Sequence, residues 1–159
     1  MNVMDLQDCI VVFDMDGVLS RYDFGDLGFK IISEPGWVRA NIETDIYQFT
    51  TKTSLFDELI NSKNPMDMYV LSVASSSYEQ ANKIRFIEEN YGNIRKDNII
   101  FVARTSYKIE VLKYLRDLYD MHGKKHKQII MIEDAVSVLD DVETLANNGI
   151  ECYLVSDFI

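Results

Sequence analysis

The chain alternates short apolar runs with longer stretches in which apolar residues recur at helical spacing. Short runs without polar alternation are typical of strands that are buried on both faces of a parallel sheet. Longer stretches with apolar residues on one face predict amphipathic helices between these strands. The runs that predict strands are 9–13, 68–71, 99–102, 129–132 and 150–155.

Helices are predicted from the same spacing, together with polar residues that can cap a helix and glycines that can end one. The first predicted helix is 54–61, which ends before Pro65. The second is capped by Ser75, Ser76 or Ser77 and ends at Gly92; the apolar residues on one of its faces are Ala81, Ile84, Ile87 and Tyr91. The other two are a helix capped by Thr105 or Ser106, with a stripe of Ile109, Leu112, Leu115 and Tyr119, and a helix through Val138, Leu139, Val142, Leu145 and Ala146 up to Gly149.

Strands that alternate with helices predict right-handed crossovers and a parallel sheet covered on both faces. We therefore expect an α/β fold, a three-layer Rossmann-like arrangement with a five-stranded parallel sheet, in one domain over 1–159. The stretch from about 20 to 53 interrupts this alternation and is predicted to be a small insertion after the first strand. It is broken early by Gly25, Gly28, Pro35 and Gly36, and the later residues Trp37, Ile42, Ile46, Tyr47 and Phe49 are compatible with a helix.

Sixteen basic and twenty-six acidic residues give a formal net charge of -10. This balance disfavours polymeric nucleic acid and anionic membranes as partners, so an anionic ligand would need a local positive site. The sequence has no apolar run of about 18 residues and no basic-then-apolar leader, so we expect a soluble, cytoplasmic protein. Cys9 and Cys152 lie in strand-like runs and are expected to be buried, reduced thiols. His122 and His126 lie in a polar, lysine-rich connection and are expected to be solvated.

Chemically reactive side chains stand where the predicted strands end. Asp14 and Asp16 follow the first strand, Ser72 ends the second, Lys108 lies in the first turn of the helix after the third, and Glu133 and Asp134 close the fourth. The carboxyl ends of parallel strands meet at one edge of a sheet, where ligands bind in open α/β folds. Asp14 and Asp16 would point the same way in extended chain, and two neighbouring anions call for a cation.

The run Asp14-Met15-Asp16-Gly17-Val18 after an apolar strand resembles the first motif of the haloacid dehalogenase superfamily of phosphohydrolases and phosphotransferases. In that superfamily an aspartate pair, a serine or threonine, a lysine and an acidic pair follow one another. Ser72, Lys108 and the pair Glu133-Asp134 match in type, order and strand position.

The resemblance implies that Asp14 is a nucleophile that forms an aspartyl-phosphate. A carboxylate with an ordinary pKa of about 3.9 is ionised at neutral pH and needs no separate base. Asp16 would protonate the leaving oxygen and later deprotonate the attacking water, which favours a carboxyl group whose pKa is raised by nearby negative charge.

Attack by an anion on a phosphate dianion needs cations, and Mg2+ suits carboxylates, water and phosphate oxygens. By resemblance, Asp14 and Asp134 would ligate the ion directly, the backbone carbonyl of Asp16 would add a contact, and Glu133 would act through water or as an alternative ligand. Lys108 and the Ser72 hydroxyl would hold the phosphoryl oxygens.

Several neighbours offer alternative assignments. Ser72 could be only a turn former, with Ser75 or Ser76 in its role, and Lys113 competes with Lys108 but lies deeper in the helix. The acids Asp140 and Asp141 are expected at the surface; the alternative is that one of them contacts a ligand of the metal. Arg104 is expected at the surface rather than against substrate.

The stretches 83–92, 98–102 and 104–108 resemble the 5'(3')-deoxyribonucleotidase branch of the superfamily, over the middle third of the chain. The chain departs from that branch at Ser72, which is followed by Val73-Ala74 where the branch has a Thr-Ser pair, and in its shorter cap. A small cap would leave an open mouth, which a second subunit in a homodimer could complete. Trp37, Tyr47 and Phe49 are expected to pack against the core rather than to stack on a base.

The expected function is a magnesium-dependent phosphatase that hydrolyses a small phosphomonoester, with a nucleoside monophosphate as the leading candidate. A phosphomutase that returns the phosphoryl group to its substrate would use the same residues. A module that binds a phosphorylated ligand without turnover is the alternative outside enzymes, and the presence of Asp16 argues against it. A receiver domain of two-component signalling is not expected to carry the Asp-x-Asp-Gly turn followed by an insertion.

Overall fold

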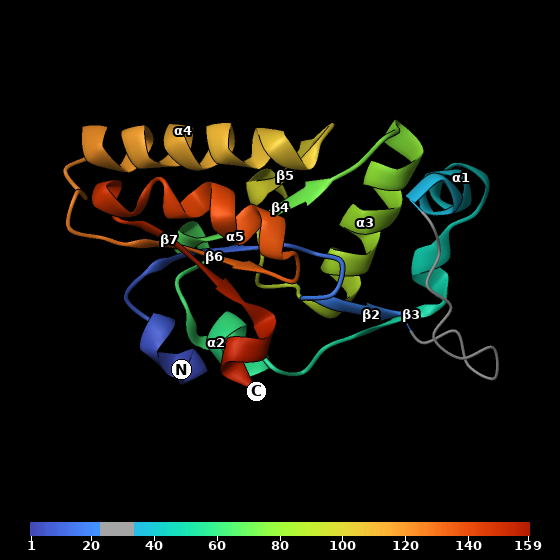
Figure 1. Ribbon diagram of the computed structural model, residues 1–159. Helices are drawn as coiled ribbons and strands as arrows, with labels where there is room; N and C mark the ends of the chain where they lie inside the picture. The colour runs from blue at the N-terminus through green and yellow to red at the C-terminus, as the bar shows by residue number, and fades with distance from the viewer. Residues whose placement is uncertain (23–33) are drawn as a thin grey trace.

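The computed structural model describes residues 1–22 and 34–159. Its centre is a five-stranded sheet in the order β5-β4-β1-β6-β7, and every pairing in it is parallel. The strands are β1 Ile10–Phe13, β4 Met68–Val73, β5 Ile99–Val102, β6 Ile129–Glu133 and β7 Ile150–Leu154 (Figure 1). The predicted α/β class, the five strands and their parallel pairing are therefore confirmed, and the architecture is consistent with a Rossmann-like fold.

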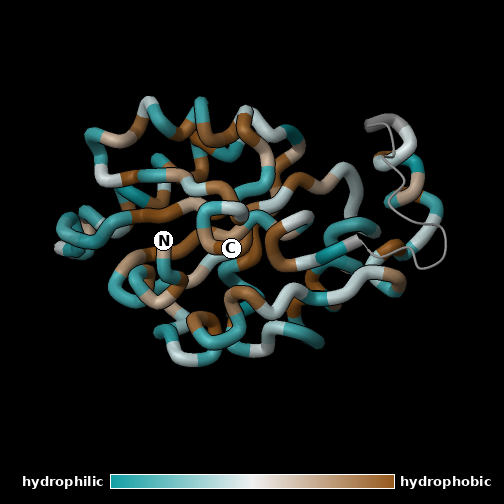
Figure 2. The backbone as a smooth tube through the Cα atoms, turned by 60° about the horizontal axis from the view of Figure 1, so that its bottom comes forward, coloured by the Kyte–Doolittle hydropathy of each residue, from teal (hydrophilic) through white to brown (hydrophobic). Residues whose placement is uncertain are grey.

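Helices cover both faces of the sheet, because alternate residues of each strand point to opposite sides. Val11 and Phe13 of β1 belong to the core that packs under α2 (Asp57–Ser62) and α3 (Ser77–Asn90). Ile10 and Val12 belong to the core under α4 (Lys108–Met121) and α5 (Val136–Glu143). Figure 2 shows that the stretches of apolar residues run through the middle of the molecule. Because β1 contributes side chains to the core on each face of the sheet, it lies at the centre of the fold.

The described parts of the segment 20–52, residues 20–22 and 34–52, lie beside α3, and a second sheet closes their base. Strand β2 (Ser20–Tyr22) pairs antiparallel with β3 (Thr50–Lys52), and α1 (Glu34–Glu43) lies between them in the chain. At the base, the Thr53 amide donates to the Leu19 carbonyl at 3.1 Å. The hydroxyl of Tyr91, the residue that follows α3, lies 2.7 Å from the Leu19 carbonyl and 2.8 Å from that of Thr53.

This segment differs in detail from its prediction. The strand pair was not predicted, because β2 and β3 are three residues each and carry no apolar run. Pro35 and Gly36 do not break the chain but lie in the first turn of α1, where proline costs no hydrogen bond. Ile46 and Tyr47 lie in a separate 3-10 turn, Ile46–Gln48, and the predicted breaks at Gly25 and Gly28 lie outside the described residues.

Helix ends were predicted less accurately than helices. Thr105 and Ser106 do not cap α4: they form the 3-10 turn Thr105–Tyr107, which leads directly into the helix. Helix α3 ends at Asn90, and Gly92 is not in the left-handed region. Helix α5 ends at Glu143, before Gly149 adopts a φ of 71°. The remaining 3-10 turns are Val3–Leu6, Pro65–Asp67, Lys96–Asn98, Ala146–Asn148 and Val155–Phe158.

Other predictions concern exposure. His122, His126, Arg104, Asp140 and Asp141 are exposed, as predicted. The thiols of Cys9 and Cys152 are free but half-buried rather than fully buried. None of the helices in the described parts of the chain has both the length and the apolar character needed to cross a bilayer.

Candidate functional site

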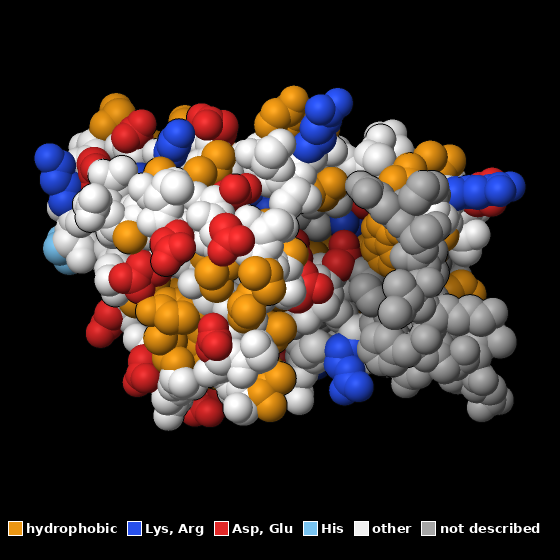
Figure 3. Space-filling model, viewed as in Figure 1, with side chains coloured by type: hydrophobic (Ala, Val, Ile, Leu, Met, Phe, Trp, Pro, Cys, Tyr) orange, Lys and Arg blue, Asp and Glu red, His pale blue; other side chains and the backbone are white. Residues whose placement is uncertain are grey.

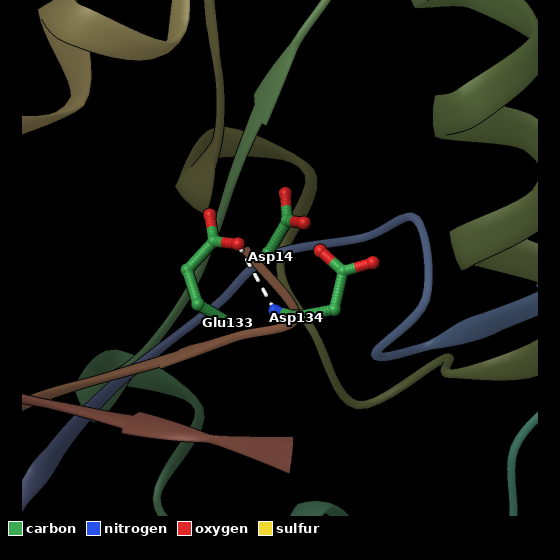
Figure 4. A group of neighbouring side chains, drawn as sticks. All are labelled: Asp14, Glu133 and Asp134. Atoms are coloured by element: carbon green, nitrogen blue, oxygen red, sulfur yellow. Dashed lines mark hydrogen bonds between the residues drawn. The ribbon is translucent and has the colours of Figure 1, made fainter. Parts of the chain in front are cut away.

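Residues from β1 and β6 meet at the carboxyl edge of the sheet. Phe13 of β1 is paired with Ile132 of β6, and the Asp14 amide donates to the Ile132 carbonyl at 2.9 Å. This register places Asp14 beside Glu133 and Asp134 as the two strands end. Figure 4 shows the three carboxyl groups gathered beyond the strand ends, where the predicted site residues were expected to converge.

The three acids form a cluster that could hold a metal ion. Their ligand oxygens all lie within 4.8 Å of one another, and they are the only such cluster found in residues 1–22 and 34–159. Asp14 and Glu133 are buried, whereas Asp134 is exposed. Hard carboxylate oxygens are the ligands that Mg2+ and Ca2+ prefer, so the donor set fits a hard divalent cation. Asp134 is therefore the member of the cluster that solvent reaches.

Lys108 is the cation of this cluster. It is the first residue of α4, it is 4% exposed, and its ammonium lies 2.9 Å from Asp14 Oδ1 and in closer contact with Glu133. Burial disfavours its charge, but the two carboxylates outweigh burial and raise its pKa. Lys113, the alternative from the sequence, is exposed and pairs with Glu110. The structure therefore brings Lys108, and not Lys113, to the acids.

One buried lysine does not balance three carboxylates. Burial, opposed by Lys108 and reinforced by Glu133, raises the pKa of Asp14 to about 8. Burial and the charge of Glu133 likewise raise the pKa of Asp134 to about 6. A carboxyl group with a raised pKa keeps its proton at a higher pH, and a metal cation that binds the carboxylate displaces that proton. The cluster thus binds protons more tightly than isolated carboxylates do, and a divalent cation would displace them.

Glu133 is held more firmly than a free metal ligand would be. One of its oxygens contacts Lys108, and the other accepts from the backbone amides of Asp134 at 3.0 Å and Ala135 at 3.2 Å. These bonds satisfy both oxygens of a side chain that is 1% exposed. Glu133 therefore orients Lys108 and the turn that carries Asp134, in addition to lying within reach of a shared ion.

Gly17 shapes the space for Asp134. Its φ is 83°, in the left-handed region, and an added Cβ would lie 2.2 Å from Asp134 Oδ2. Although Asp134 is exposed as a residue, its carboxyl group is therefore packed against the turn after β1. Only glycine satisfies both requirements, the turn and the close approach.

Asp16 lies across the turn from Asp14 and has its own set of donors. Its Oδ1 accepts from the Tyr47 hydroxyl at 2.7 Å and from the Ser20 hydroxyl at 3.4 Å. Its Oδ2 accepts from the Lys83 ammonium at 2.9 Å. Tyr47 comes from the segment 20–52 and Lys83 from α3, so Asp16 is the point where the segment, the helix and the edge of the sheet meet.

Ser72 is buried at the end of β4 and its Oγ lies 2.9 Å from the Lys83 ammonium. The two serines that could have replaced it are used elsewhere. The Ser75 amide and hydroxyl donate to Glu79, and the Ser76 hydroxyl caps α3 by accepting from the Glu79 amide. Ser72 is thus the serine that shares a partner with Asp16.

Lys83 is the site residue that sequence reasoning missed. Of the predicted apolar face, Ile87 and Tyr91 are buried, but Ala81 is exposed and Ile84 only half-buried. The buried face carries Glu79, Lys83, Phe86 and Ile87. Glu79 and Lys83 are four residues apart, a spacing also typical of a solvated ion pair, so the available signal was ambiguous.

The aromatic residues of the segment 20–52 behave differently from one another. Tyr47 is buried and its ring lies 5.9 Å from that of Phe86. Trp37 is half-buried and packs against the core, as expected, whereas Phe49 is 58% exposed, against expectation.

Comparisons with known protein families, with curated protein sequences and with solved structures found no match to this chain. The class of protein is therefore defined by its architecture, an α/β chain with a parallel sheet. The particular feature of this chain is the cluster of acids and lysines at the carboxyl edge of that sheet.

Proposed function

We propose that this chain is a magnesium-dependent phosphatase that hydrolyses a small phosphomonoester through an aspartyl-phosphate on Asp14. The observation that carries the proposal is the position of Lys108 between Asp14 and Glu133, with Asp134 within 4.8 Å of both acids. Phosphoryl transfer through a covalent intermediate requires a nucleophilic carboxylate, a cation beside it and oxygen ligands that can hold a metal ion.

Asp14, Asp134 and the backbone carbonyl of Asp16 would hold the Mg2+ ion, with Glu133 as a further ligand or as a partner through water. When bound, the ion would offset the negative charge of a phosphoryl group and hold its oxygens. The exposure of Asp134 supports this assignment, because a phosphate would reach the ion from that side.

In the first step, an Asp14 oxygen attacks phosphorus as the bond from phosphorus to the leaving oxygen breaks. Lys108 keeps the Asp14 carboxylate oriented and offsets its charge, and Asp16 donates a proton to the leaving oxygen. In the second step, Asp16 takes a proton from a water that attacks phosphorus, and the bond to Asp14 breaks. The products are an alcohol, inorganic phosphate and the original carboxylate.

The substrate proposed first is a nucleoside monophosphate, on the likeness of 83–92, 98–102 and 104–108 to the deoxyribonucleotidase branch. The segment 20–52 would act as a small cap over the site, and a homodimer would complete its mouth. A phosphomutase remains the second candidate, because the same groups serve both reactions and only the acceptor differs.

The test is hydrolysis of p-nitrophenyl phosphate with Mg2+, with excess chelator, and by two variants. We expect turnover that stops on chelation, and a fall of roughly 1,000-fold or more in kcat for Asp14→Asn. Asp140→Asn, an exposed acid of α5 outside the cluster, serves as the control and should leave kcat unchanged. Full activity of Asp14→Asn would rule out the mechanism.

The same assay separates the candidates. A panel of nucleotides, sugar phosphates and phospho-amino acids should give inorganic phosphate for a phosphatase, whereas a mutase should give an isomeric phosphate ester. A protein that binds these compounds with Mg2+ but releases neither product would be a binding module.

A further inference from the structure

Lys83 places an ammonium group in the interior of the protein, and this group has no direct role in the proposed reaction. It is fully buried, at 0% exposure, so it cannot touch a ligand itself. A buried charge is costly unless it is paired and hydrogen-bonded. Its place in the structure therefore has to be explained by the groups that it contacts.

The three hydrogens of the Lys83 ammonium have defined acceptors. They point to Asp16 Oδ2 at 2.9 Å, Ser72 Oγ at 2.9 Å and the Val73 carbonyl at 2.6 Å. Glu79, at 3.1 Å, adds a second carboxylate. Two of these partners are groups that the proposed mechanism brings to the phosphoryl group, and the other two fix the ammonium to β4 and α3.

The direction of the bond to Ser72 decides what that hydroxyl can do. An ammonium group only donates hydrogen bonds, so Ser72 Oγ must accept from Lys83. Its own hydrogen is then available to an acceptor other than Lys83, and a hydroxyl that accepts from a cation is a better donor. Asp16 is fixed by the same nitrogen, so one buried cation sets the geometry of both groups.

We propose that Lys83 is a positioning residue for the phosphoryl site, which directs the Ser72 hydroxyl as a donor to phosphoryl oxygen and holds Asp16 beside it. The inference rests on the proposed function and adds a residue to it. It requires that Lys83 acts through Ser72 and Asp16, and not merely as a tie between α3 and the end of β4.

The experiment is a double-mutant cycle in a background that avoids a second unpaired charge. Glu79→Gln keeps an oxygen for the Ser75 donors and removes the carboxylate that Lys83→Met would leave unpaired. Glu79→Gln alone is the matched control, because Lys83 then still contacts Asp16 and Ser72. Each protein is made with Ser72 and with Ser72→Ala, and kcat, KM, melting temperature and Mg2+ affinity are measured with p-nitrophenyl phosphate as substrate.

We expect Glu79→Gln to retain kcat within about threefold, and Lys83→Met in that background to lose about 10–100-fold, as for a hydrogen bond to a charged group. Mg2+ affinity should change little, because Lys83 contacts the side chain of Asp16 rather than its backbone carbonyl, and no contact joins Lys83 to Asp14, Glu133 or Asp134 in the described residues. In the Ser72→Ala background the loss caused by Lys83→Met should shrink by about fivefold or more, since the two residues then no longer act together.

Equal losses in both Ser72 backgrounds, or a lower melting temperature with kcat unchanged, would overturn the positioning role while leaving the phosphatase intact. An unaltered chain that turns over no phosphomonoester would instead overturn the proposed function, and the role with it. Lys83→Gln, which keeps an N–H donor without the charge, is taken through the same cycle where the methionine variant does not fold.

Discussion

Gly17 is the residue at which the turn after β1 and the acidic pair after β6 come into contact. Its left-handed backbone is unfavourable for residues with a Cβ, and a Cβ would also displace the Asp134 carboxyl group. The sequence motif Asp-x-Asp-Gly therefore has a steric basis in this chain that is independent of any likeness to a family. Glycine provides room for a carboxylate that comes from another strand.

Gly17→Ala should lower the free energy of unfolding by about 1–2 kcal/mol, because the alanine is strained and Asp134 has to move. It should also weaken Mg2+ binding by about tenfold, since a ligand is displaced. Gly92→Ala is the matched control: an added Cβ there meets only the Glu88 carbonyl at 3.8 Å. Chemical denaturation and calorimetric Mg2+ titration measure both effects, and equal behaviour of the two alanine variants would contradict the steric argument.

Tyr47 joins the segment 20–52 to Asp16 through a single oxygen, while its ring packs on Phe86. Tyr47→Phe removes the hydrogen bond and keeps the packing. We expect kcat to fall by about 10-fold, as for the loss of a bond to a charged group, with little change in melting temperature. Tyr153→Phe, which loses a bond to Glu151 instead, is the control and should leave kcat unchanged. Unchanged kcat in Tyr47→Phe would show that Asp16 does not depend on this contact.

The strands and helices that the sequence predicted are those set by local pattern. The five strands followed from apolar runs, and Asp14, Glu133 and Asp134 followed from the rule that parallel strands end at one edge. The short strands β2 and β3 have no such pattern, and they form by pairing with each other across the two ends of the segment 20–52. The buried face of α3 was predicted correctly at Ile87 but not at Ala81 and Ile84, because Lys83, which contacts Asp16 and Ser72, faces inward instead.

Tyr91 ties α3 to both ends of the segment 20–52. Its hydroxyl lies within hydrogen-bond distance of the carbonyls of Leu19 and Thr53, and burial raises its pKa to about 12. Tyr91→Phe should therefore lower the free energy of unfolding by about 1 kcal/mol and make the segment open more readily. Hydrogen exchange of the Thr53 amide, which donates to Leu19, measures the local opening. Tyr78→Phe, at an exposed site in α3, should change neither quantity.

The molecule carries a net charge of -10, yet some of its lysines are buried. Figure 3 shows acidic side chains spread over the face that carries α4 and α5. Lys83 and Lys108 lie inside, against Asp16, Asp14 and Glu133. The surface therefore does not attract an anion in general, and selectivity for a phosphate would depend on the interior lysines and on a bound cation.

The acid cluster predicts a dependence of stability on pH whose sign changes with Mg2+. The pKa of Asp134 is raised to about 6 in the folded chain, above its ordinary value, so the folded state binds more protons between these values. Without metal, the contribution of this carboxyl group to stability falls as pH rises through that window and is least favourable above it. Asp134→Asn imitates the protonated form and should remove this loss.

In chelator, Asp134→Asn should match the unaltered chain at about pH 3, below both pKa values, and be more stable by about 1 kcal/mol at pH 8, a value reduced for solvent screening of an exposed group. With Mg2+ at about 100 times its dissociation constant, the order should reverse, because the ion stabilises the unaltered chain by about 2.7 kcal/mol. Asp140→Asn should show neither effect. Thermal melts at both pH values, with and without Mg2+, make the comparison; a constant difference between the chains under all four conditions would mean that Asp134 neither repels its neighbours nor binds the ion.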